Sequence, residues 1–115
     1  LCGTNGDRYH KLLPAIEQVE SGGDPNAVGD KGKAVGILQI QPIMVRDCNR
    51  IMGESRWVMA DRLDPDKSRA MFRVYSEHYS RGAGDEVVAR RWNGGPAGHA
   101  KRETVAYWHK VRAAM

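Results

Sequence analysis

The feature that most constrains this chain is a series of short amphipathic segments, each ended by glycine or proline. In the first segment, apolar side chains recur every three to four residues, the spacing of one helix face: Tyr9, Leu12, Leu13, Ile16 and Val19. Residues 21–26, rich in glycine and proline, then end it. Alternating apolar and polar residues, typical of a half-buried strand, are almost absent. The pattern therefore predicts an all-α domain of about five helices, with at most a minor short β element.

Local start and stop signals set the expected helix boundaries. Pro14 is tolerated only in a first turn, so the first helix is expected to begin near Lys11. Pro42 and Pro65 suit a first helical position, and Asp64 can cap the helix that follows it. The further helices are expected over residues 42–52, 65–81, 85–92 and about 103–113. Residues 28–33 are expected to form a loop, and residues 35–40 either a short strand or a buried helix end.

Length and charge limit the class of protein without choosing a function. A chain of 115 residues fits a single domain, residues 1–115, that buries a core without a metal. The net charge of +4 is compatible with nucleic acid, an anionic membrane or an anionic wall polymer. No nucleic-acid motif, membrane-spanning stretch or signal peptide is recognisable. Cys2 and Cys48 are too few for a zinc site; they permit one disulfide, and two buried thiols are the alternative.

Glu20 breaks the pattern of its helix. It falls about 40° from the centre of the apolar stripe, whereas Glu17 falls about 100° away, near the wet edge. Burial and the negative end of the helix dipole both disfavour an ionised carboxylate at Glu20. A carboxyl group that stays protonated near neutral pH can act as a general acid. The alternative is an ordinary glutamate at a helix end, where the period no longer applies.

Glycoside hydrolysis uses two carboxyl groups in unlike environments, which makes nearby aspartates relevant. Asp30 is a candidate partner for Glu20, whereas Asp24, placed before Pro25, is more typical of a turn. The chain also has three Trp and four Tyr against one Phe. Flat rings with a polar tip suit sugars, although most such rings pack in a core.

Four segments, in order along the chain, resemble the motifs of soluble lytic transglycosylases, the goose-type-lysozyme-like enzymes of bacterial cell walls. Residues 19–28 (Val-Glu-Ser-Gly-Gly-Asp-Pro-Asn-Ala-Val) resemble the first motif. Residues 34–42 (Ala-Val-Gly-Ile-Leu-Gln-Ile-Gln-Pro) are similar to the family's Gly-Leu-Met-Gln-Ile-x-Pro. Residues 91–96 (Arg-Trp-Asn-Gly-Gly-Pro) are similar to Ala-Tyr-Asn-Ala-Gly-Pro. Residues 103–111 (Glu-Thr-Val-Ala-Tyr-Trp-His-Lys-Val) are similar to the closing Glu-Thr-x-x-Tyr-Val-x-x-Val.

The resemblance implies a lysozyme-like helical fold and a role for each matching residue. Glu20 would be the catalytic acid and base, and Ser21 would support it or contact sugar. Gln39 and Asn93 would line the cleft and hydrogen-bond the substrate. Tyr107 would orient the reacting carboxyl group or the sugar. No metal or organic cofactor is implied.

Two departures leave the mechanism open. Trp92, a candidate sugar contact, stands where the family has Tyr, so the hydroxyl normally supplied there is missing. Residues 19–48 also resemble invertebrate-type lysozymes, in which an Asp near the position of Asp30 is the second catalytic carboxylate. The first resemblance implies transfer to the sugar's own 6-hydroxyl and a 1,6-anhydro product. The second implies attack by water.

The expected function is cleavage of the β-1,4 bond between N-acetylmuramic acid and N-acetylglucosamine in peptidoglycan. The partner would be the glycan strand, with no nucleic acid, and the protein would be a monomer. It would act in the periplasm, at the cell wall or after secretion. The alternatives are a hydrolytic lysozyme, in which Asp30 joins Glu20, or a module that binds glycan without cleaving it. A basic helical bundle that binds nucleic acid is a third and weaker reading.

Overall fold

Proline and glycine set the helix boundaries at the expected places. In the computed structural model, which describes residues 7–115, helix α1 (Leu12–Ser21) takes Pro14 into its first turn. It ends at Gly22, which adopts a left-handed φ of 66°. Helix α2 (Pro42–Met52) begins at its proline and ends at Gly53, with φ 73°. The predicted starts and stops of both helices are confirmed.

The remaining helices also lie close to their predicted positions. Helix α3 (Pro65–Tyr79) is capped by Asp64, whose carboxylate accepts hydrogen bonds from the backbone N–H groups of Asp66 and Lys67. Helix α4 (Asp85–Gly94) and helix α5 (Thr104–Ala114) follow. Three short 3₁₀ helices were not predicted: η2 (Asp30–Gly32), η3 (Met59–Leu63) and η4 (Gly98–Ala100).

Within residues 7–115, the β structure is limited to a small hairpin between α1 and α2. Strand β1 (Val28–Gly29) pairs antiparallel with β2 (Ala34–Val35), and an isolated bridge joins Val35 to Ile40. The expected loop over residues 28–33 is therefore partly wrong, because its first two residues pair as a strand. The alternative of a buried helix end at residues 35–40 is also wrong. The fold is all-α with a minor β element, as predicted, and is lysozyme-like.

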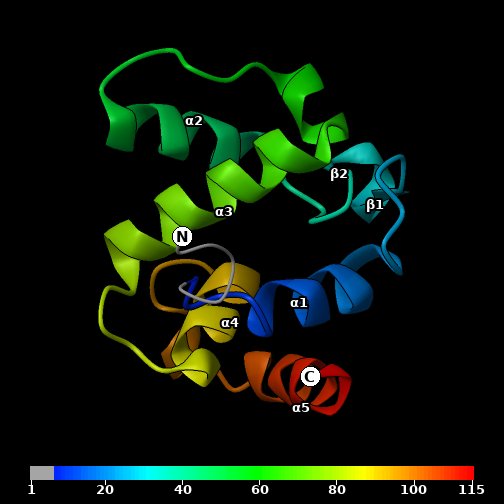
Figure 1. Ribbon diagram of the computed structural model, residues 1–115, viewed down its shortest axis with the longest axis vertical. Helices are drawn as coiled ribbons and strands as arrows, with labels where there is room; N and C mark the ends of the chain where they lie inside the picture. Colours follow the sequence, from blue (N-terminus) through cyan, green and yellow to red (C-terminus); the bar gives the residue numbers. More distant parts are fainter. Residues whose placement is uncertain (1–6) are drawn as a thin grey trace.

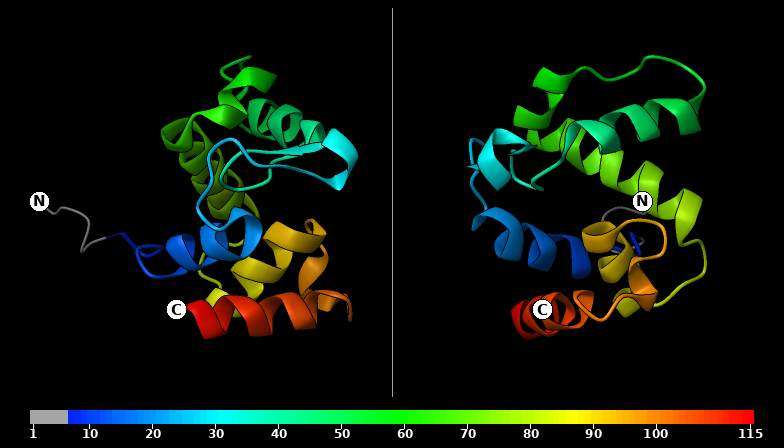
Figure 2. Two further views of the ribbon diagram at one scale, coloured as in Figure 1. Left: turned by 90° about the vertical axis from the view of Figure 1, so that its right-hand side faces the viewer. Right: turned by 180° about the vertical axis from the view of Figure 1, so that it is seen from behind.

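The helices form two lobes (Figure 1). One lobe contains α1, α4 and α5, with α5 running beneath the other two in both views of Figure 2. The other contains α2, η3 and α3. The lobes meet at Phe72 of α3, which is fully buried and packs edge-to-face against Tyr9 and against Trp92 of α4. Each such aromatic pair contributes about 0.5–1.5 kcal/mol beyond its buried area.

Glu17 does not lie near the solvent-exposed edge of its helix, so the predicted position of this side chain is wrong. Its side chain is only 10% exposed, because the guanidinium of Arg69 reaches it from α3. Arg69 donates to both carboxylate oxygens, at 2.7 and 3.2 Å. A buried carboxylate with two charge-assisted hydrogen bonds is compensated for its lost water.

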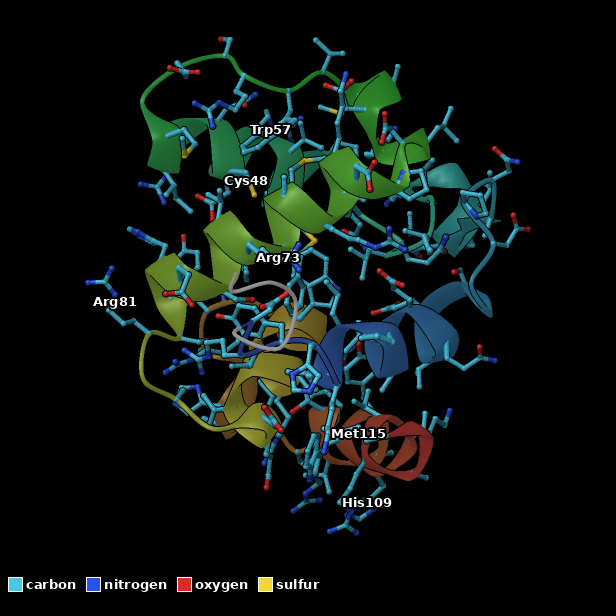
Figure 3. The ribbon with its side chains drawn as sticks, viewed as in Figure 1. Cys48, Trp57, Arg73, Arg81, His109 and Met115 are labelled. Carbon is cyan, nitrogen blue, oxygen red and sulfur yellow. The ribbon has the colours of Figure 1, made fainter. Side chains whose placement is uncertain are left out.

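Cys48 is fully buried between α2 and α3 (Figure 3), and its thiol contacts the carbonyl oxygen of Met71 at 3.5 Å. The suggested disulfide to Cys2 lies outside the described residues. No helix within residues 7–115 is both long enough and apolar enough to cross a bilayer.

Candidate active site

A cleft of about 920 Å³ opens between the two lobes. It is bounded by the end of α1, the hairpin, one face of α2, the end of α4 and the start of α5. Glu20, Asp30, Gln39, Trp92 and Asn93 all line it, although they come from segments far apart in the sequence. The volume is at the upper end of the range for small-ligand sites and suits a short stretch of polymer.

Glu20 is the next-to-last residue of α1 and its side chain is half-buried at the cleft. Burial raises its pKa from 4.5 to about 7, and the hydrogen bond from Tyr107 offsets part of that rise. Within residues 7–115 no cation pairs with this carboxylate. The pKa of Glu20 thus lies near neutral pH, where a carboxyl group can both give and take a proton.

Tyr107 approaches Glu20 from α5, on the side away from the cleft. Its hydroxyl donates to Glu20 Oε2 at 2.9 Å, although the two residues are 87 positions apart. Burial raises the pKa of Tyr107 well above its usual value, and the nearby carboxylate adds to that rise. The phenol therefore remains a proton donor in the hydrogen bond and fixes the orientation of the carboxyl group.

Ser21 holds the hairpin against α1, whereas Gln39 makes its hydrogen bonds within the hairpin. The Ser21 hydroxyl donates to the carbonyl of Ile37 at 2.8 Å, and Ser21 is not among the residues lining the cleft. Gln39 does line the cleft, with a left-handed φ of 51°. Its amide nitrogen donates to the carbonyls of Ala27 and Gly36, at 3.1 and 3.0 Å. Both amide protons are therefore used within the hairpin, which leaves the amide oxygen as the group free to accept.

Asp30 lies across the cleft from α1, at the tip of the hairpin. Its side chain is exposed, and Oδ2 accepts a hydrogen bond from the amide of Gln41 at 3.0 Å. Asp30 and Lys31 both adopt left-handed φ values, 51° and 57°, a conformation that Asp tolerates better than most residues. The structure thus brings Glu20 and Asp30 to one cleft and gives them unlike surroundings.

Trp92 and Asn93 occupy the end of α4. Trp92 is 4% exposed, and its ring is packed edge-on against Phe72 and Tyr75. It forms the floor of the cleft rather than a free stacking platform. Asn93 is exposed beside it. Tyr75 of α3 also lines this wall, and its ring packs edge-to-face against Trp92.

One face of α2 supplies cleft residues that the motifs did not indicate. Ile43, Arg46, Asp47 and Arg50 line the cleft and recur at helical spacing. That spacing was the available signal, but nothing in it shows that this face meets a cleft rather than bulk water. The described residues contain no cluster of three His, Cys, Asp or Glu side chains able to hold a metal ion.

A helical domain with a cleft between its two lobes, and a glutamate of raised pKa at the end of its first helix, has a lysozyme-like fold. The model of the transglycosylase SLT domain matches residues 5–112, so the chain belongs to the SLT family. No curated protein gives a significant match.

A solved structure supports the same fold. A chain in the crystal structure of Aeromonas hydrophila PliI in complex with Meretrix lusoria lysozyme is similar to this protein with a TM-score of 0.75 and 27% identity. The similarity covers 90% of this chain and 87% of that chain.

Proposed function

We propose that this protein is a lytic transglycosylase that breaks the β-1,4 bond between N-acetylmuramic acid and N-acetylglucosamine in peptidoglycan. The observation that carries the proposal is the Glu20 carboxyl group, half-buried at the cleft, with a pKa raised by burial to about 7. A group with a pKa near the working pH serves equally well as an acid and as a base. Membership of the SLT family supports the substrate class.

In the first step, protonated Glu20 gives its proton to the glycosidic oxygen while the bond to the muramyl C1 breaks. Positive charge develops on C1 and the ring oxygen, as in other glycosidases. The Glu20 carboxylate formed in this step accepts the hydrogen bond from Tyr107, which favours the charged form.

In the second step, Glu20 takes the proton of the muramyl 6-hydroxyl, and that oxygen bonds to C1. The product is a 1,6-anhydro sugar, no water is consumed, and Glu20 is protonated again. One carboxyl group therefore suffices. Ser21 and Gln39 position the hairpin, while Asn93, Trp92 and Tyr75 contact the bound sugars from the other wall.

We further propose that residues 1–115 form a single domain that acts as a monomer in the periplasm, at the wall or outside the cell. Its net charge of +4 favours approach to an anionic wall, although physiological salt screens most of that attraction.

A hydrolytic lysozyme is the second candidate, and Asp30 is the observation that favours it. Asp30 lines the same cleft as Glu20, and Gln41 fixes one of its carboxylate oxygens. In this alternative Asp30 stabilises the cationic centre or attacks it, and water completes the reaction. A lysozyme is also one of the two proteins named in the structural match.

Mass spectrometry of the soluble products from purified peptidoglycan tests both candidates. The transglycosylase yields anhydromuropeptides with the natural sequence and none with Glu20→Gln. Reducing-end products, heavier by one water, would instead establish the lysozyme. Absence of products with either protein would leave a module that binds glycan without cleaving it.

Asp30→Asn separates the mechanisms further. It should leave a transglycosylase nearly unchanged and inactivate a lysozyme that depends on Asp30. Asp66→Asn is the matched control, because the Asp66 side chain is 96% exposed on α3 and outside the cleft lining.

A further inference from the structure

One wall of the cleft carries chemistry that a bare sugar chain does not require. We call this the α2 wall: Ile43, Arg46, Asp47 and Arg50, which share the cleft-facing side of α2. A sugar chain without charge is bound by aromatic faces and by hydrogen-bonding side chains, and needs no exposed aliphatic side chain or unpaired cation. The α2 wall instead presents an aliphatic side chain that is 63% exposed, Ile43, and guanidinium groups beyond it.

The two arginines of the α2 wall differ in their hydrogen-bond and ion-pair partners. Arg50 donates through Nε and Nη2 to Asp47 Oδ1, at 2.9 and 2.7 Å. It also donates to the Tyr79 hydroxyl at 3.0 Å, and that hydroxyl donates to Asp47 Oδ2 at 2.6 Å. Arg50 and Asp47 therefore neutralise each other in a fixed network.

Arg46 is exposed and, within residues 7–115, forms no salt bridge. Its guanidinium is the uncompensated cation of the α2 wall. A guanidinium presents paired N–H donors in a plane, the arrangement that a carboxylate accepts with both oxygens.

The other charges of the cleft do not create a general attraction for anions. Lining carboxylates at Glu20, Asp30, Asp47 and Glu103 face three cations, Arg46, Arg50 and Lys101. The lining therefore carries no net positive charge, whether Glu20 is ionised or protonated. An anion would therefore be bound at Arg46 by local contact rather than by the field of the whole cleft.

Resting on the proposed function, we infer that the α2 wall binds the peptide stem of the muramyl residue, with Arg46 pairing with a stem carboxylate and Ile43 contacting its alanyl part. Such stems combine small apolar side chains with free carboxylates, which is the complement of Ile43 followed by Arg46. The stems also branch from the sugar chain. When the sugars fill the cleft, each stem must extend out of it along one of its walls. Arg46 thus makes the protein selective for stems that carry a free carboxylate.

The test compares untreated peptidoglycan with peptidoglycan whose stem carboxylates have been converted to carboxamides by carbodiimide and ammonia. Arg46→Gln should lower kcat/KM on the untreated substrate about tenfold, the loss of one charge-assisted contact. On the amidated substrate it should remain within about twofold of the natural protein. Arg46→Lys keeps the charge without the paired donors and should retain part of the preference.

Arg81→Gln is the matched control, since Arg81 extends into solvent beyond the end of α3 (Figure 3) and does not line the cleft. It should change neither rate. Equal losses with Arg46→Gln on both substrates, or equal rates of the natural protein on both, would overturn the proposal.

A binding measurement keeps this proposal separate from the proposed function. With Glu20→Gln as background, cosedimentation with insoluble peptidoglycan should be stronger for the carboxylated form, and adding Arg46→Gln should abolish that difference. If no protein cleaves either substrate, the proposed function fails while this measurement still decides the role of Arg46. Equal binding to both forms would overturn the stem subsite.

Discussion

The two faces of α1 hold carboxylates less than one helical turn apart in opposite surroundings. On the face toward α3, Glu17 is 8% exposed and receives two hydrogen bonds from Arg69. On the face toward the cleft, Glu20 is half-buried and receives one hydrogen bond, from the neutral phenol of Tyr107. The two carboxylates differ in their partners: within residues 7–115 Arg69 pairs with Glu17, whereas no cation pairs with Glu20. Burial without a compensating cation raises the pKa of Glu20 to about 7.

The largest expected difference between the two faces of α1 is in the enzymatic activity of variants at Glu20 and Glu17. Glu20→Gln should lower kcat about 10²- to 10⁴-fold, because an amide can neither donate nor accept the transferred proton. Glu17→Gln should leave the activity of each folded molecule unchanged. Initial rates of wall solubilisation, normalised to folded protein by circular dichroism, measure both. A comparable loss in Glu17→Gln would show that the distinction between the faces is wrong.

The next effect is the pH dependence of stability. The folded pKa of Glu20 is about 7 against an ordinary 4.5, so the unfolded chain loses this proton first as the pH rises. The free energy of unfolding should therefore fall between about pH 4.5 and 7, by up to about 3 kcal/mol. Glu20→Gln removes this loss, so its stability advantage should be small at about pH 4 and largest above about pH 7. Urea unfolding across this range measures it, and an advantage that shrinks with rising pH would contradict the raised pKa.

On the other face, Glu17→Gln should destabilise the fold by about 1–3 kcal/mol, because Arg69 loses its partner. The cost stays below that of a fully buried pair, since Arg69 is 35% exposed and keeps some water. Arg69→Met combined with Glu17→Gln should cost less than the sum of the single changes. Additive costs in urea unfolding would show that the two side chains do not stabilise each other.

The smallest expected effect is a shift of the pH profile when Glu20 loses its hydrogen bond from Tyr107. Tyr107→Phe removes the hydrogen bond that lowers the pKa of Glu20, so the alkaline limb of the kcat/KM profile should move to higher pH. Tyr9→Phe, which removes a phenol–carboxylate contact with Glu77 outside the cleft, is the control and should leave the limb in place. A downward shift in Tyr107→Phe would contradict the assigned role.

The helix boundaries were predictable because their causes are local. Pro42, Pro65 and Asp64 act within one helical turn, and Gly22 and Gly53 act through their own backbone conformations. The position of Glu17 was not predictable in the same way. Periodicity assigns a helix one buried stripe, whereas α1 packs against α4 and α5 within its own lobe and is also reached by Arg69 from the other lobe.

The chemistry of the cleft depends on tertiary contacts that the spacing of residues along the sequence does not predict. Burial of Glu20 followed from the helical period, but its hydrogen bond from Tyr107 was implied only by family resemblance. The use of both Gln39 amide protons within the hairpin was not foreseen, because it requires the left-handed turn at that residue. The position of Arg46 in the cleft could not be predicted, because the sequence does not distinguish it from other exposed cations on helices.

The contact between Tyr107 and Glu20 spans 87 positions of the chain. A ribosome therefore makes the glutamate early and the helix that buries and orients it much later. Until α5 has been made and has docked against α1, Glu20 remains open to water and keeps the acidity of a free side chain. The raised pKa of Glu20 is thus a property that only the completed and folded chain acquires.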